Sequence, residues 1–184
     1  MDARQRKTRE ALFNALEALL EEADYADITV SKLARRADVG RPTFYRHFES
    51  VDAMLEEQLR DGLDEQLTLS RANVPNLQAH SWMELAATHA FSRAQDRPRL
   101  FQLALAGAAG NRALQLFQAQ IETLMDEVAA CPGFVEVDSR TRPHQSAFYA
   151  GAIFGMLKDW LDKGMPQTPE EMGVIFASLT NLPR

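Results

Sequence analysis

Residues 29–48 read TVSKLARRADVGRPTFYRHF and hold the pattern that decides the fold. Apolar side chains recur at three- and four-residue spacing on both sides of a central turn, which predicts two short helices over 30–37 and 41–48. Thr29 is suited to cap the first helix, and Gly40 permits a sharp turn between the two. We therefore expect a helix-turn-helix unit.

Two phenylalanines orient the second of these helices. Phe44 and Phe48 lie one turn apart, so both can be buried together against the rest of the unit. Each residue advances the helix by about 100°, and burial of Phe44 therefore turns the opposite side to solvent. The exposed side and its edges carry Arg41, Pro42, Thr43, Tyr45, Arg46 and His47.

Such a face is rich in groups that bind DNA. Arginine can bind guanine through two hydrogen bonds, and threonine, tyrosine and histidine can contact phosphate. Thr29 and the backbone amides that it caps form a second candidate phosphate contact. The alternative is a helical hairpin used only for packing, with solvated arginines.

The segment resembles the DNA-binding domain of TetR-family transcriptional regulators, whose signature is close to T-x-x-x-[IL]-A-x-x-A-x-V-[SG]-x-x-[TS]-[FL]-Y-x-[HY]-F. The matching residues are Thr29, Leu33, Ala34, Ala37, Val39, Gly40, Thr43, Phe44, Tyr45, His47 and Phe48. The resemblance implies a helix-turn-helix domain over 1–49 and an effector-binding and dimerisation domain over 50–184. It also implies a repressor that binds a palindromic, double-stranded operator as a homodimer and is released by a small molecule.

One position departs from the family pattern. A lysine commonly follows the final phenylalanine as a phosphate anchor, whereas this chain has Val51 with two acidic residues nearby. We expect weaker DNA binding, or a transfer of the anchoring to the second short helix and to the basic arm of Arg4, Arg6 and Lys7. The departure also leaves open a TetR-fold adaptor that acts through protein partners rather than DNA.

The remaining sequence is patterned almost entirely for helices. We expect further helices over 4–22, 50–71, 81–97, 100–106, 111–130 and 145–163, and one from 169 onward, so that the fold is all-α with about nine helices. Two of the starts carry the Ser/Thr-x-x-Glu capping pattern, at Ser81 and at Thr168. Gly107 and Gly110 are expected to end one helix, and Gly164 another.

Residues 145–181 are similar to the closing helix pair of a broad TetR subgroup, which forms a four-helix dimer interface. Small residues here permit close helix contact, and apolar residues exceed what one subunit needs. The expected interface residues are Phe148, Gly151, Ala152, Gly155, Met156, Trp160, Met172, Ile175, Phe176 and Leu179. The alternative is that they only complete an internal core.

Members of this family usually hold an effector among the middle helices. The candidate lining residues are Trp82, His89, Phe101, Phe117, Gln120, Met125 and Tyr149. Because most of these side chains are apolar, an apolar or aromatic effector is the expected class. The alternative for each residue is a place in the ordinary core.

The amino-acid composition argues against several other classes of protein. The chain of 184 residues has a net charge of −6, which argues against coating nucleic acid or membranes, although its first 48 residues carry nine basic and eight acidic side chains. The single cysteine, Cys131, cannot form an internal disulfide, and no leader opens the chain, so we expect a cytoplasmic protein. The histidines lack metal-ligand spacing, and no phosphate loop or activated nucleophile is apparent; we expect no enzyme activity, metal or cofactor.

Overall fold

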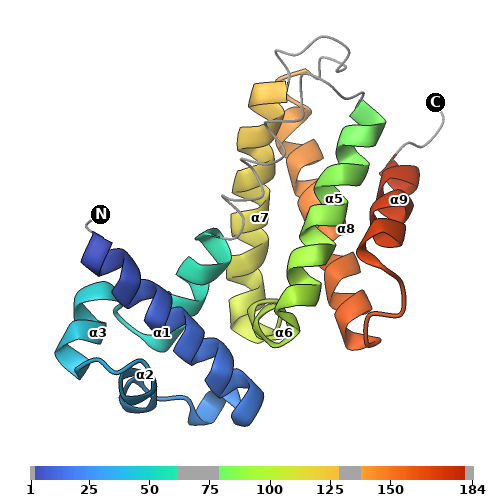
Figure 1. The fold of residues 1–184 in the computed structure, drawn as a ribbon. Helices are drawn as coiled ribbons and strands as arrows, with labels where there is room; N and C mark the ends of the chain where they lie inside the picture. The colour runs from blue at the N-terminus through green and yellow to red at the C-terminus, as the bar shows by residue number, and fades with distance from the viewer. Residues whose placement is uncertain (1–2, 62–78, 129–137, 181–184) are drawn as a thin grey trace.

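The structure is a computed structural model that describes residues 3–61, 79–128 and 138–180, and those residues contain helices but no strand (Figure 1). The predicted all-α class is therefore confirmed. The elements are α1 (Ala3–Glu22), the 3₁₀ turn η1 (Tyr25–Asp27), α2 (Val30–Arg36), α3 (Arg41–His47), α5 (Ala79–Asp96), α6 (Pro98–Ala104), α7 (Gly107–Val128), α8 (Arg142–Asp162) and α9 (Pro169–Thr180). A further helix covers residues 51–61.

The N-terminal helices surround one apolar core. Its fully buried side chains come from α1, α2, α3 and the helix at 51–61, and they are Leu12, Leu16, Leu33, Phe44 and Met54. Leu100 of α6 also lies in this core. The N-terminal core is therefore completed by an element from the second half of the chain, which contacts α1.

The C-terminal helices form a layered bundle in which α9 lies along α5 and α7 lies along α8 (Figure 1). Phe91 and Trp160 meet edge to face at the centre of its core, with ring centroids 5.1 Å apart. At Gly173 the two helices α5 and α9 approach so closely that an added Cβ would lie 2.0 Å from Oγ1 of Thr88. The bundle is thus tightly packed along α5 and α9.

The predicted start of α9 is confirmed in detail. The backbone amide of Thr168 donates to Oε2 of Glu171 at 2.8 Å, and the amide of Glu171 donates to Oγ1 of Thr168 at 3.2 Å. Gly164 ends the preceding segment with a φ of +78°, the left-handed conformation expected of it. These two local signals fix the corner between α8 and α9.

Several predicted helix boundaries differ from those in the structure. The helix α5 begins by Ala79, so the Ser81 pattern lies inside it. The helix α6 ends at Ala104, and α7 already begins at Gly107, so Gly110 lies inside α7. A helical glycine costs only about 1 kcal/mol relative to alanine, which packing of the apolar stripe of α7 can outweigh.

The helices α6 and α8 each begin a few residues earlier than predicted, with a proline in the first turn. First-turn amides have no intrahelical acceptor, and proline is therefore accommodated there. Cys131, the break predicted near 73–76 and the predicted helix beyond residue 61 lie outside the described residues. Within the described ranges, no helix is both long and apolar enough to cross a membrane.

Candidate nucleic-acid interface

The orientation of α3 is set from its inner side. Phe44 is completely buried and Phe48 is 3% exposed, and their ring centroids lie 5.8 Å apart. Phe13 of α1 extends this aromatic group, with its ring centroid 5.5 Å from that of Phe48. The predicted joint burial of the two phenylalanines is confirmed.

The other side of α3 meets solvent. Tyr45 is 51% exposed, and Arg41, Pro42 and Arg46 are also exposed. Thr43 and His47 are half-buried at the edges of this face. Hereafter the outward face of α3 means Arg41, Pro42, Thr43, Tyr45, Arg46 and His47. The structure brings all six predicted residues together on one short helix.

Thr29 and the turn position α2 against α3. Oγ1 of Thr29 accepts a hydrogen bond from the amide of Lys32 at 3.3 Å, which confirms the predicted cap. In the turn, Asp38 has a φ of +54°, whereas Gly40 has a φ of −75° in extended backbone. The left-handed residue is therefore Asp38 and not the glycine, and aspartate is one of the few side chains that tolerate this conformation.

The N-terminal arm of α1 lies beside α3. A surface hollow of about 280 Å³ separates the two elements and is lined by Arg4, Gln5, Thr8, Arg46 and His47. The hollow therefore carries two guanidinium groups, one imidazole and two neutral polar side chains. These groups can form charge-assisted hydrogen bonds to a phosphate group.

His47 is electrostatically the most perturbed group of this hollow. Burial lowers its pKa, and the nearby positive charges of Arg46 and Arg9 lower it further, whereas Glu57 acts in the opposite direction. The imidazole is therefore neutral at pH 7, when it can donate one hydrogen bond. A bound anion would favour its protonated form.

Val51 stands where the family commonly has lysine, and its side chain cannot anchor a phosphate. Val51 is half-buried and packs against the N-terminal core. Its neighbour Asp52 accepts a hydrogen bond from the hydroxyl of Tyr25 at 2.5 Å, and burial together with this carboxylate raises the pKa of Tyr25. The amide of Ala53 donates to Oγ of Ser50 at 3.0 Å, which caps the helix at 51–61.

Sequence reasoning missed the role of Arg9. Its guanidinium forms ion pairs with Glu57 at 2.7 Å and Asp61 at 3.3 Å, and it stacks over the rings of Phe13 and Phe48. The spacing of Arg9 and Phe13 on one helix face could have suggested their contact. The other three partners are distant in sequence and carry no local signal.

The effector candidates are distributed through the C-terminal bundle. Phe101 and Phe117 are buried in its core, with Tyr149 packed against them, whereas Trp82 is buried outside that cluster. Gln120 and His89 are half-buried, and the Nδ1 atom of His89 is buried without a hydrogen-bond partner in the described part of the chain. The side chain of Met125 lies outside the described residues.

The dimer candidates separate into two groups. Trp160, Met172 and Phe176 are at most 7% exposed and lie in the core of the subunit, where they offer little surface to a partner. The candidates that reach the surface are Phe148, Gly151, Ala152, Gly155, Met156, Ile175 and Leu179, although Ala152 and Met156 do so only in part. Val174, which is not among the predicted residues, is 51% exposed on α9.

The chain matches known protein families over most of its length. Residues 8–57 match the family described as "Bacterial regulatory proteins, tetR family", and residues 84–182 match the one described as "Transcriptional regulator C-terminal region". A curated relative, the uncharacterized HTH-type transcriptional regulator YxbF of Bacillus subtilis (strain 168), is 27% identical over 179 residues. The match covers 96% of this chain but only 45% of that relative.

Solved structures share the fold. The fatty acid degradation regulator FadR from Bacillus halodurans has a TM-score of 0.69 at 17% identity, covering 97% of this chain and 99% of that one. FadR from Bacillus subtilis, in complex with stearoyl-CoA, has a TM-score of 0.68 at 19% identity, covering 92% and 96%. At such identities the likeness establishes the architecture alone.

Proposed function

This chain belongs to the TetR family of bacterial transcriptional regulators, and from that premise we propose that it represses transcription by binding a palindromic operator as a homodimer. The observation that carries the proposal is the cationic, solvent-facing side of α3, opposite the completely buried Phe44. An exposed helix of this kind fits the major groove of B-DNA. Arg46 and Arg41 are the proposed base-reading groups.

Phosphate binding is assigned to the groups around α3. Tyr45 and Thr43 lie on the reading helix α3 itself, and Thr29 caps α2. His47 lies in the hollow shared with the arm of α1, where Arg4 is a further phosphate contact. This arrangement compensates for Val51 at the family's lysine position.

Selection of genomic DNA fragments with the purified protein tests the proposed function. We expect enrichment of a site with two-fold symmetry, because a symmetric dimer places its two reading helices in successive major grooves about 34–36 Å apart. Fragments without a common site would contradict sequence-specific repression. If the dimer stayed intact while enriching no DNA, the adaptor alternative would be favoured, consistent with the acidic side chains around Val51.

Dimerisation is assigned to the outer surface of α8 and α9. Phe148 is 59% exposed, Leu179 57% and Ile175 38%, although all three side chains are apolar. Gly151 and Gly155 lie on the same helix as Phe148, and an added Cβ at either would touch nothing within the subunit. Exposed apolar side chains beside small residues are typical of a helix-packing interface.

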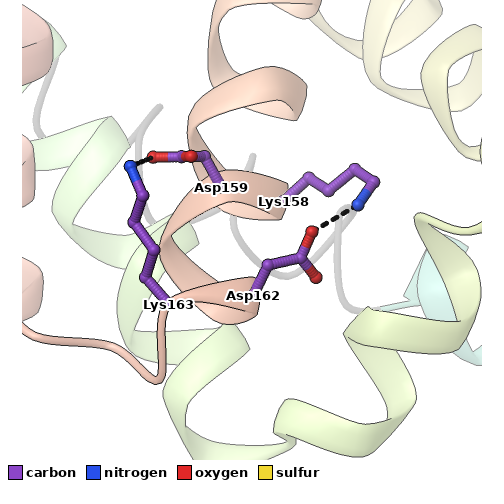
Figure 2. A network of polar contacts seen from close by, with 4 residues as sticks. All are labelled: Lys158, Asp159, Asp162 and Lys163. Atoms are coloured by element: carbon purple, nitrogen blue, oxygen red, sulfur yellow. Dashed lines mark hydrogen bonds and ion pairs between the residues drawn. The ribbon is translucent and has the colours of Figure 1, made fainter.

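Charged side chains bound this surface at the end of α8. Lys158 pairs with Asp162, and Lys163 pairs with Asp159 at 2.7 Å, as Figure 2 shows. All four are exposed, and such pairs contribute only about 0.2–1 kcal/mol each. Their place at the end of the apolar stripe fits the polar rim of an interface.

Glutamate at Phe148 and Leu179 tests the interface. We expect the double variant Phe148→Glu/Leu179→Glu to be monomeric in sedimentation analysis and to bind the operator at least tenfold more weakly. Ala119→Glu, which places a charge on an exposed site of α7, is the matched control and should remain dimeric. A double variant that stayed dimeric would place the interface elsewhere.

Release by a small apolar molecule completes the proposed function. His89 supports it, because its buried Nδ1 has no hydrogen-bond partner among the described residues and can be satisfied by a polar group of a ligand. Stearoyl-CoA is a suitable first probe, since a structural neighbour holds it. We expect an effector to weaken operator binding by about 1–3 kcal/mol, measured as the ratio of Kd values with and without the probe. A probe that bound without changing DNA affinity would contradict its role as a switch.

A further inference from the structure

We propose that Arg9 is a positioning residue for DNA binding, which fixes the end of α3 against the helix at 51–61 and neutralises two carboxylates on that helix, of which Glu57 lies beside the outward face. The inference rests on the proposed DNA-binding function. It assigns to Arg9 a role different from that of the exposed basic residues that precede it on α1.

A single guanidinium joins three elements at this point. Its Nη2 atom lies 2.7 Å from Oε1 of Glu57 and 3.3 Å from Oδ2 of Asp61, both on the helix at 51–61. Its central carbon lies 5.0 Å from the ring centroid of Phe48, directly after α3, and 5.4 Å from that of Phe13 on α1. Planar arginine can stack on aromatic rings and pair with carboxylates at once, whereas lysine offers only a point charge.

Burial separates Arg9 from a direct phosphate contact. Its side chain is 13% exposed, whereas that of Arg6 on the same helix is 70% exposed. The nitrogen that forms the ion pairs already faces two carboxylates, so a phosphate would have to displace them. Arg9 therefore acts on DNA through the groups that it holds.

Acidic side chains near His47 explain why the charge of Arg9 matters for DNA binding. A second surface hollow, of about 290 Å³, adjoins His47 and is lined also by Phe48, Glu49, Ala53, Glu56, Glu57 and Arg60. Three carboxylates therefore lie immediately beside the phosphate-binding side of α3. Charges within about 10 Å still interact at 0.1 M salt, and unpaired carboxylates here would repel the DNA backbone.

Neutral variants of both partners provide the test. Operator affinity is measured for Arg9→Gln alone and together with Glu57→Gln and Asp61→Asn. We expect Arg9→Gln to weaken binding at least tenfold and the two carboxylate changes to recover most of that loss. Arg9→Lys should reduce operator affinity less than Arg9→Gln does, since lysine retains the positive charge although it cannot stack on the rings.

Arg6→Gln is the matched control, because Arg6 is an exposed cation one turn earlier on α1. Adding Glu57→Gln and Asp61→Asn should raise the operator affinity of both variants. The factor of increase should be at least fivefold smaller for Arg6→Gln than for Arg9→Gln. Equal improvement of both variants, or unchanged affinity of Arg9→Gln, would overturn the positioning role. If the unaltered protein bound no DNA, the proposed function itself would fail; if it bound and Arg9→Gln bound equally, only the Arg9 proposal would fail.

Discussion

At the scale of the residue, Phe44 determines which side of α3 meets solvent. Its ring is completely buried among Leu12, Leu33 and Met54, so the helix cannot rotate without exposing it. Because Phe44 is buried, the polar residues on the opposite side of α3 face the solvent. The same logic applies to Gly173, where absence of a side chain permits contact between two helices.

Gly173→Ala is expected to reduce the free energy of unfolding by about 1–3 kcal/mol, because overpacking forces neighbouring groups to move. Its Cβ would lie 2.0 Å from Oγ1 of Thr88 and 2.8 Å from the carbonyl oxygen of Glu84, which is backbone. Chemical denaturation in the monomeric Phe148→Glu/Leu179→Glu background measures the effect. Gly155→Ala, whose Cβ meets nothing, is the control and should be neutral or stabilising; equal losses in both would contradict the steric account.

The lowered pKa of His47 predicts that operator binding depends on pH. Its pKa is lowered in the free protein, and a bound phosphate would raise it, so the complex takes up protons as the pH falls. Affinity should therefore increase by about threefold to tenfold from about pH 7.5 to pH 5.5, measured by fluorescence anisotropy. His47→Gln should flatten the profile, whereas replacing the exposed His144 by glutamine should leave it unchanged. A profile identical in the unaltered protein and His47→Gln would remove His47 from the interface.

At the scale of the element, the same short pattern succeeds at one helix and fails at another. Thr168 and Glu171 cap α9 because Gly164 and the proline that follows cannot continue α8. Ser81 and Glu84 have the same spacing, yet the residues before Ser81 extend the helix instead. A capping pattern therefore marks a helix start only where the upstream residues cannot be helical.

Thr168→Ala should lower the free energy of unfolding by about 1 kcal/mol, because it leaves the amide of Glu171 without its acceptor. Ser81→Ala is the comparison, and it should change stability by less than about 0.5 kcal/mol, as an exposed substitution within a helix. Thermal and denaturant unfolding measure both. A larger loss for Ser81→Ala than for Thr168→Ala would reverse the assignment of the two sites.

Features set by neighbouring residues could be predicted from the sequence, whereas contacts between distant segments could not. The spacing of Phe44 and Phe48 predicted the exposed side of α3, because both signals lie within one turn. The partners of Arg9 on the helix at 51–61 could not be predicted, since they are brought together only by folding. Burial of Trp160 within its own subunit could not be predicted, because an apolar stripe indicates burial without showing whether a second subunit or the same chain covers it.

At the scale of the whole molecule, the reading helix and the C-terminal bundle are mechanically connected. Leu100 of α6 lies in the N-terminal core, and Arg97 pairs with Glu17 of α1 at 3.1 Å. Glu17 also accepts a hydrogen bond from Gln58 at 2.6 Å. These contacts join α6 to α1, and we propose that the effector acts on the reading heads through them.

In the proposed function, the outward face of α3 binds operator DNA. The most direct test is the Kd of the selected operator for the unaltered dimer and for Arg46→Ala, with Arg140→Ala as an exposed control outside the helix-turn-helix. We expect Arg46→Ala to weaken binding by about 1–3 kcal/mol, or roughly 5- to 150-fold, and Tyr45→Phe to weaken it less, with dimer mass and helicity unchanged. Operator binding by Arg46→Ala as tight as that of the unaltered protein would contradict the account.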